Sequence, residues 1–373
     1  MKKIGIITHY YKSVNYGGNL QAYALCRYLQ NMGYQAEQIC YDTCLDPKKS
    51  VIERLKSNHI QKKLSLEINR KFFGQFGEQR AALLAFNQQD IPHSKSVYTR
   101  ETIRDCRQYD AYITGSDQVW NLDWYRPVYF LHFAPPNKPK IAYAASLGHN
   151  TLTAKQTEVF QKFLPEFSAI SVREKDSVDL LAPLARVPVK WSLDPVLLLT
   201  REQWDSICGE RLIHEPYLFC YFLGRPERRL ARMFARKHGL KIAAIPYLCE
   251  TSLVHMKRFE DFRLSGVSPK EFISLIKHAE YVFTDSFHAT AFSELYRTPY
   301  AVFRRDGTDS MTSRIYSVTS IFESRERFCD TDEKETLEYI ESLPPMEQKK
   351  EFPLLESMRE KSYRFLKDSL SGI

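Results

Sequence analysis

One stretch, Tyr281–Arg297, constrains the fold of this chain more than any other. It opens with the apolar run Tyr281–Phe283, which predicts a short buried strand. The polar residues Thr284–Ser286 break that run and favour a helix N-cap. A helical pattern follows, so His288 should lie in the first turn of a helix that begins at the carboxyl end of a strand. Ligands of open α/β sheets bind at such positions.

The start of that predicted helix is suited to hold an anion. Its first N–H groups have no partner within the helix, and they would point at a ligand placed before Ser286. His288 would add a proton donor beside them. The simpler interpretation is that His288 only caps or covers the helix end, because strand–helix junctions are common in α/β folds.

Charge and cysteine content narrow the class of protein. The 373 residues predict two or three domains. The net charge of +8 suits an anionic substrate or an anionic membrane surface, and it is below the extreme of a nucleic-acid coat. The eight cysteines are scattered and include no CxxC pair, so we expect neither a zinc site nor a redox motif. Free thiols indicate a reducing cytoplasm.

The sequence shows no segment typical of membrane crossing or secretion. No apolar run approaches the ~18 residues that a spanning helix needs. The apolar run after Met1–Lys3 is too short for a signal peptide and predicts the first strand instead. We therefore expect a cytoplasmic protein, with the inner face of the membrane as an alternative location.

A βαβ unit is predicted at the start of the chain, with strands at Lys3–His9 and Tyr34–Tyr41 around a helix at Leu20–Met32. The loop before this helix ends in Gly17, Gly18 and Asn19. Paired glycines let the backbone approach a ligand closely, so these three residues are candidate substrate contacts. The motif is not GxGxxG, so no dinucleotide site is predicted, and a tight turn remains the alternative.

Residues 46–108 predict a basic, helical insertion. Its cations are Lys48, Lys49, Arg54, Lys56, Lys62, Lys63, Arg70 and Lys71. A solvated helix face is the ordinary explanation of such a run, and a patch that meets anionic lipid is the other.

Two further predicted strands end in polar residues. Tyr109–Thr114 is followed by a loop with Ser116, Asp117 and Trp120, in which Asp117 could take a proton from a hydroxyl and Trp120 could stack on a sugar ring. The alternative is a capped helix start with a core tryptophan. A later strand ends at Arg173, a residue type that grips carboxylates and phosphates in bidentate fashion. The alternative there is a surface ion pair with a neighbouring acid.

The alternation of strands and helices predicts two Rossmann-like α/β domains with mostly parallel sheets that face a cleft. We place the first at residues 1–205 and the second at 206–373, with an amphipathic helix at the end. Clefts between domains are favoured ligand sites.

Several separate segments resemble one family. They are Asn15–Leu25, Tyr109–Asn121, Ser171–Ser177, Leu193–Leu197, Thr284–Glu294 and Ser313–Ile315, in this order. Together they look like the polysaccharide pyruvyl transferase family. The resemblance implies a fold like that of two-domain GT-B glycosyltransferases. It also implies transfer of pyruvate from phosphoenolpyruvate onto glycan hydroxyls as a cyclic ketal.

The resemblance implies that Arg173 and His288 bind phosphoenolpyruvate as a co-substrate. Because arginine and helix N–H groups suit this small anion and the sequence shows no metal-ligand cluster, we expect no metal or other cofactor. We expect Ser286 and the helix start to hold the phosphate and Arg314 to be a second clamp. Asp117 or Asp285 would be the base, and Trp120 would line the acceptor, a glycan or lipid-linked sugar.

Two other functions stay open. A GT-B glycosyltransferase with a nucleotide-sugar donor would need a similar helix N-terminus, because fold does not determine function. A non-enzymatic protein that binds nucleic acid or anionic glycan is compatible with the charge, although nucleic acid is not an expected partner.

Overall fold

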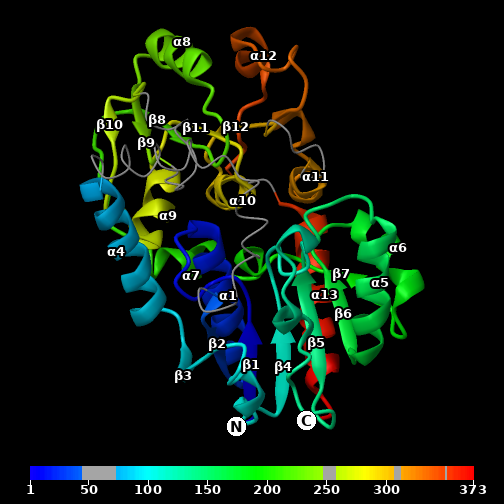
Figure 1. Cartoon of the computed structure of the whole chain (residues 1–373). Helices are drawn as coiled ribbons and strands as arrows, with labels where there is room; N and C mark the ends of the chain where they lie inside the picture. Colours follow the sequence, from blue (N-terminus) through cyan, green and yellow to red (C-terminus); the bar gives the residue numbers. More distant parts are fainter. Residues whose placement is uncertain (44–72, 247–257, 306–311, 349–350) are drawn as a thin grey trace, which may run out of the picture.

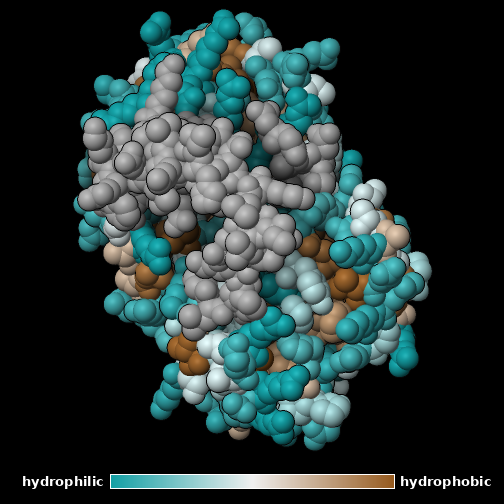
Figure 2. Space-filling model, viewed as in Figure 1, coloured by the Kyte–Doolittle hydropathy of each residue, from teal (hydrophilic) through white to brown (hydrophobic). Residues whose placement is uncertain are grey.

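The computed structural model describes residues 1–43, 73–246, 258–305, 312–348 and 351–373. The basic run predicted between Lys48 and Lys71 lies outside the described residues, so the predicted lipid-binding patch lies there too. The described part of the face in Figure 2 is largely hydrophilic, and its hydrophobic side chains form small separate groups.

The first sheet has seven parallel strands in the order β3-β2-β1-β4-β5-β6-β7. Their bounds are Lys3–Ile7 for β1, Gln35–Tyr41 for β2, His93–Tyr98 for β3, Ala111–Thr114 for β4, Lys140–Ala145 for β5, Ala169–Val172 for β6 and Val189–Trp191 for β7. The chain grows outward from β1 in one direction and from β4 in the other. The carboxyl ends of β1 and β4 therefore form the crevice where doubly wound sheets bind ligands.

The second sheet repeats this order with six parallel strands, β10-β9-β8-β11-β12-β13. Their bounds are Tyr217–Tyr221 for β8, Lys241–Ala244 for β9, Phe262–Arg263 for β10, Tyr281–Thr284 for β11, Tyr300–Phe303 for β12 and Phe328–Cys329 for β13. In this sheet the strand order reverses between β8 and β11, so the corresponding crevice lies at their carboxyl ends. The prediction of two Rossmann-like domains with parallel sheets is confirmed.

Helices connect the strands and cover the sheets. Their bounds are Tyr16–Asn31 for α1, Phe73–Gln89 for α4, Ala154–Phe163 for α5, Asp176–Leu181 for α6, Arg201–Asp205 for α7, Arg228–His238 for α8, Pro269–Lys277 for α9, Phe287–Tyr296 for α10, Thr312–Ile321 for α11, Leu337–Ser342 for α12 and Pro353–Leu370 for α13. Figure 1 shows the two sheets one above the other, with α1 and α10 between them.

Two sequence assignments change. The segment 46–108 is helical at α4, but it then supplies β3, the edge strand of the first sheet, so it is more than a helical insertion. The terminal helix α13 lies along the first domain and not the second (Figure 1). The backbone N–H of Leu193 donates to Ser362 Oγ at 3.1 Å, and Arg359 Nε donates to Leu197 O at 2.9 Å. Residues 353–370 therefore return to the first domain, which sequence periodicity alone does not reveal.

The domains meet through α1 of the first and α9 and α10 of the second. Tyr16 is central to this contact, because its ring stacks on Phe272 with centroids 4.7 Å apart and its hydroxyl donates to Val267 O at 2.8 Å. One hydrophobic cluster runs through both domains as a result. Through this packing the first turns of α1 and α10 lie against each other, and both turns carry residues of the candidate site.

Candidate functional site

Arg173 lies directly after β6 and is buried among three carboxylates. Its Nη1 donates to Asp194 Oδ2 at 2.9 Å and lies 3.4 Å from Asp117 Oδ1, and its Nε donates to Glu174 Oε1 at 3.1 Å. Its other terminal nitrogen, Nη2, has no hydrogen-bond partner among the residues that the structure describes. A buried N–H donor without a partner is costly, so the geometry favours an acceptor supplied from outside the chain.

His288 lies in the first turn of α10, as its sequence pattern predicts. Ser286 is the N-cap, and its side chain accepts a hydrogen bond from the backbone N–H of Ala289. His288 Nε2 lies 3.7 Å from Asp194 Oδ2, which is too long for a hydrogen bond, and within the described part of the chain it has no other partner. The structure thus brings Arg173 and His288, one from each domain, to the same carboxylate oxygen.

Asp194 is the residue that joins them. It follows β7 and caps a short 3-10 helix, because its side chain accepts from the backbone N–H of Val196 at 3.1 Å. Burial alone would raise the pKa of Asp194, but the neighbouring His288 and Arg173 hold the pKa of this carboxyl well below its usual range. Asp194 therefore stays ionised and acts as a positioning residue, a role that sequence reasoning missed.

Asp117 also stays ionised. Burial raises its pKa, but Arg173 and then His288 and His9 outweigh burial, so the pKa of Asp117 is lower than usual. Its side chain remains partly exposed, so a substrate hydroxyl can reach it. Arg173 has a raised pKa because Glu174, Asp194 and Asp117 together outweigh its burial.

Arg314 of α11 adds a buried cation to the same group. Burial and the neighbouring charges of Arg173 and Arg305 together lower the pKa of Arg314 to about 9, against the opposing effect of Glu174 and Asp117. A bound anion would favour the charged form of Arg314. This location suits the second clamp that the sequence suggested.

Asp285, predicted as a base, lies in a different setting. Its Oδ1 accepts from the backbone N–H of Leu223 at 2.6 Å, and its Oδ2 accepts from Gly224 N at 2.7 Å and Arg305 Nε at 3.0 Å. These three hydrogen bonds already occupy both oxygens of the carboxylate. Asp285 anchors the loop after β8, and Arg305 is a site neighbour that the sequence did not single out.

The glycines before α1 approach a side chain. A Cβ on Gly17 would lie 1.9 Å from His288 Nδ1, so the absence of a side chain is what lets the imidazole lie there. Gly18 N donates to the N-cap Asn15 at 3.0 Å. Asn19 is fully buried, and its amide donates to two backbone carbonyls while it accepts from Asn87 at 2.9 Å. Gly17 therefore lies directly against His288, whereas Gly18 and Asn19 hold the loop before α1, and direct substrate contact of the three residues stays a prediction.

We expect Gly17→Ala to lower activity about 10- to 100-fold, because a methyl group at this position would displace the His288 ring by roughly an ångström. Steady-state kinetics with purified variants measures this. The matched control is Gly77→Ala in α4, where an added Cβ meets nothing within 4 Å and activity should not change. Wild-type activity in Gly17→Ala would show that the position of the imidazole is unimportant.

Ser116 and Trp120 both turn inward. The Ser116 hydroxyl lies 2.8 Å from Ala144 O and 3.1 Å from Asp194 Oδ2, so it helps to position that carboxylate. Trp120 is 1% exposed, and its ring stacks on Phe130 in the aromatic core of the first domain. Trp120 is therefore a core residue, the alternative stated from the sequence, and its ring has no exposed face on which a sugar could stack.

His9 is a further candidate that sequence reasoning missed. It lies just after β1, and its Nε2 is 3.2 Å from the carbonyl oxygen of Gln118. A carbonyl only accepts, so Nε2 carries the proton and Nδ1 keeps a lone pair. Burial lowers the pKa of His9. The negative charge of Asp117 raises this pKa and the positive charge of Arg126 lowers it, and the net effect is a decrease. The same rule that pointed to the ends of β4, β6 and β11 would have found it at the end of β1.

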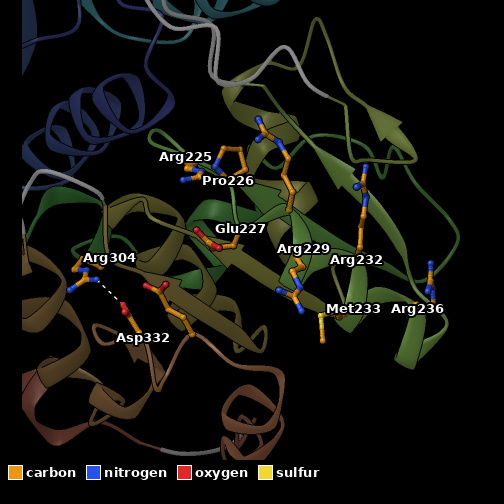
Figure 3. A pocket seen from close by; sticks show the side chains of 11 residues that line it. Arg225, Pro226, Glu227, Arg229, Arg232, Met233, Arg236, Arg304 and Asp332 are labelled. Atoms are coloured by element: carbon orange, nitrogen blue, oxygen red, sulfur yellow. Dashed lines mark hydrogen bonds and ion pairs between the residues drawn. The ribbon is translucent and has the colours of Figure 1, made fainter.

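A pocket of about 700 Å³ lies beside this site in the second domain (Figure 3). Arginines of α8 surround it, and Arg304 pairs with Asp332 at 3.2 Å across it. We call it the arginine pocket; its basic lining residues include Arg225, Arg229, Arg232, Arg236 and Arg304. The pocket residues Arg225 and Arg304 are chain neighbours of Gly224 and Arg305. Both Gly224 and Arg305 donate hydrogen bonds to Asp285, so the pocket adjoins that carboxylate.

Within the described ranges, no group of three or more histidine, cysteine, aspartate or glutamate side chains is placed to hold a metal ion. None of the helices in these ranges is both long and apolar enough to cross a bilayer.

A family model described as polysaccharide pyruvyl transferase matches residues 15–307. This match covers most of the chain, including Gly17, Asp117, Arg173, Asp194 and His288. The chain belongs to the polysaccharide pyruvyl transferase family. Arg314 lies beyond the match, so its role depends on its position in the structure. No curated protein matches this pyruvyl transferase.

Solved structures similar to this pyruvyl transferase show its fold. The UDP-GlcNAc 2-epimerase from Methanocaldococcus jannaschii has a TM-score of 0.55 at 11% identity over 98% of this chain and 99% of that chain. The UDP-GlcNAc 2-epimerase from Neisseria meningitidis bound to UDP-GlcNAc has a TM-score of 0.51 at 10% identity, over 98% of this chain and 100% of that chain. The pyruvyl transferase thus has the two-domain GT-B fold.

Proposed function

We propose that this pyruvyl transferase takes pyruvate from phosphoenolpyruvate and attaches it to two hydroxyls of a glycan or lipid-linked sugar as a cyclic ketal. The observation that supports this most is the pair of buried nitrogens, Arg173 Nη2 and His288 Nε2, which lie beside Asp194 near the start of α10 and have no hydrogen-bond partner among the described residues. Phosphoenolpyruvate offers a carboxylate and a phosphate, so it can occupy a guanidinium and a helix N-terminus together.

The proposed reaction divides into two additions at the donor carbon C2. His288 gives a proton to the methylene carbon C3, which leaves C2 cationic, and Arg173 holds the donor carboxylate. One acceptor hydroxyl adds to C2 and loses its proton to a base. The bond from C2 to the phosphate oxygen then breaks, and a second hydroxyl adds and loses its proton. Of the two protons that the hydroxyls release, one returns to His288 and replaces the proton given to C3. The other leaves on the phosphate.

A thermal-shift measurement tests the donor assignment. At a concentration of about 100 Kd, a ligand of the folded state adds about 2.7 kcal/mol to the free energy of unfolding, or roughly 3 °C in melting temperature. We expect this increase with phosphoenolpyruvate, and we expect it to persist in EDTA, because arginine and helix N–H groups provide the contacts. A shift with UDP-GlcNAc and none with phosphoenolpyruvate would instead support a nucleotide-sugar glycosyltransferase.

His9 and Asp117 are the two candidate bases. Both follow central strands of the first sheet, and each influences the pKa of the other. His9 fits the task better near pH 7, because its lowered pKa keeps the imidazole neutral while Nε2 is held by Gln118 O. Asp117 would then orient the hydroxyl that His9 deprotonates.

We expect His9→Gln to lower kcat about 100-fold and to change the pH profile. The wild-type rate should fall as the pH drops through the lowered pKa of His9, below the ordinary value of 6.5, because the protonated ring cannot accept a proton. This acidic limb should disappear in His9→Gln. His278→Gln is the control, since His278 also has a pKa lowered by burial but lies at the far end of α9. An unchanged limb in His9→Gln would rule out His9 as the base.

A further inference from the structure

A second concave surface lies on the first domain. It has a volume of about 820 Å³ and collects residues from the end of β2, from the segments after β3 and β4, and from the end of α5. We call it the N-terminal groove; the residues used here are Tyr41, Arg100, Arg104, Tyr125, Arg126 and Lys162. We propose that this groove binds the acceptor and that its chemistry selects an acidic glycan. This proposal rests on the proposed function.

The groove presents an aromatic surface that a sugar can use. Tyr125 is 41% exposed, and one side of its ring is held by Phe130, with centroids 6.1 Å apart. Phe130 in turn stacks on the buried Trp120, so Tyr125 extends a rigid aromatic core to the surface. A fixed ring with a free face and a hydroxyl suits the apolar face and polar edge of a pyranose. Tyr125 therefore does what the sequence suggested for Trp120.

The groove is also strongly basic. Arg100, Arg104, Arg126 and Lys162 line it, and the only acid among its described lining residues is Glu101. That carboxylate accepts a hydrogen bond from the Thr99 hydroxyl at 2.7 Å. A concave surface with cations of one sign raises the local concentration of anions. A neutral sugar needs no such field, whereas a uronic acid or another acidic sugar does.

The groove lies close to His9, because its lining residue Val128 precedes Tyr129, whose ring centroid is 4.4 Å from that of His9. Arg126, one of its lining residues, is close enough to His9 to lower the pKa of that imidazole. His9 in turn affects Asp117, and Asp117 lies 3.4 Å from Arg173 Nη1. An acceptor on Tyr125 and Arg126 would thus present its hydroxyls beside the two candidate bases.

The arginine pocket in Figure 3 has a different chemistry. Apart from Met233, it offers no large apolar side chain, and no aromatic ring is among its described lining residues. It fits small anions but gives a sugar ring nothing to stack on. It therefore supplies a matched control, Arg232→Gln, in which an exposed arginine is lost from a pocket of comparable size.

The test measures binding to the full chain by calorimetry, without phosphoenolpyruvate, so failure of pyruvyl transfer and failure of this inference are distinguishable. The probes are tri-galacturonic acid and neutral maltotriose. We expect the acidic probe to bind at least about tenfold more tightly to the wild-type protein. The double variant Arg100→Gln, Arg104→Gln should weaken the acidic probe about tenfold, because each exposed pair contributes up to about 1 kcal/mol. The neutral probe should not change.

Tyr125→Ala should weaken both probes about 3- to 10-fold through loss of stacking, and Arg232→Gln should weaken neither. Equal binding of the two probes to the wild-type protein would overturn the proposal, as would an equal loss of the acidic probe in Arg232→Gln. Loss of binding to anionic lipid vesicles in the double variant, with unchanged affinity for the acidic probe, would also overturn it, in favour of a membrane contact.

Discussion

Replacing Arg173 by lysine is expected to lower kcat/KM about 100- to 1000-fold while the protein remains folded. Lysine keeps the positive charge that Asp194, Glu174 and Asp117 need, but it has no planar fork and cannot place a donor at the position of Nη2. Loss of the bidentate grip on the donor carboxylate would misplace the reacting carbon, and a misplacement of about 1 Å can cost about 100-fold in rate. Steady-state assays of phosphate release from phosphoenolpyruvate with a glycan acceptor measure the effect.

The choice of lysine matters for this experiment. A neutral residue at position 173 would leave the buried carboxylates of Glu174 and Asp194 without their cation, at a cost of about 3–5 kcal/mol in stability. Such a variant could lose activity by unfolding. Arg364→Lys on α13 is the control, because Arg364 is exposed and pairs only locally with Glu360. Wild-type rates in Arg173→Lys would remove Arg173 from the proposed site.

His288→Gln is expected to lower kcat about 100- to 10,000-fold, the usual contribution of one general acid. Glutamine is close to histidine in size, so the packing against Gly17 and α1 should survive. Glutamine can still donate a hydrogen bond, but it cannot give up a proton at neutral pH. The affinity for phosphoenolpyruvate should therefore fall much less than the rate.

A matched histidine variant separates this effect from general damage. His238→Gln removes an exposed imidazole that lies near Glu341 on the far side of the second domain, and its activity should equal that of the wild-type protein. If His288→Gln binds phosphoenolpyruvate normally and also turns over normally, His288 is not the proton donor.

Much of the fold can be predicted from the sequence because both domains follow local rules. Apolar runs give buried parallel strands, and the pattern at Ser268, Pro269 and Glu271 gives a helix start that the structure confirms with a capping box. The helix start at Ser286 and the position of His288 follow from the same reasoning. α13 could not be assigned to its domain in this way, because amphipathic periodicity shows that a helix has a partner but not which one.

The candidate site divides in a similar manner. Arg173, His288 and Asp117 are predictable, because polar residues at the carboxyl ends of parallel strands collect at one edge of a sheet. Asp194 is not, because its role comes from contacts with residues distant in sequence. Trp120 and Tyr125 show the limit most clearly. Both are aromatic residues of one polar loop, and contacts with Phe160 and Phe167, distant in sequence, bury Trp120 while Tyr125 stays partly exposed.

The most direct test of the central claim is a crystal structure of the protein with phosphoenolpyruvate bound. The account predicts the ligand at the start of α10, with one of its anionic groups within hydrogen-bond distance of Arg173 Nη2 and the other next to His288 Nε2. Phosphoenolpyruvate bound elsewhere, for example in the arginine pocket, with those two nitrogens still lacking an acceptor, would contradict it.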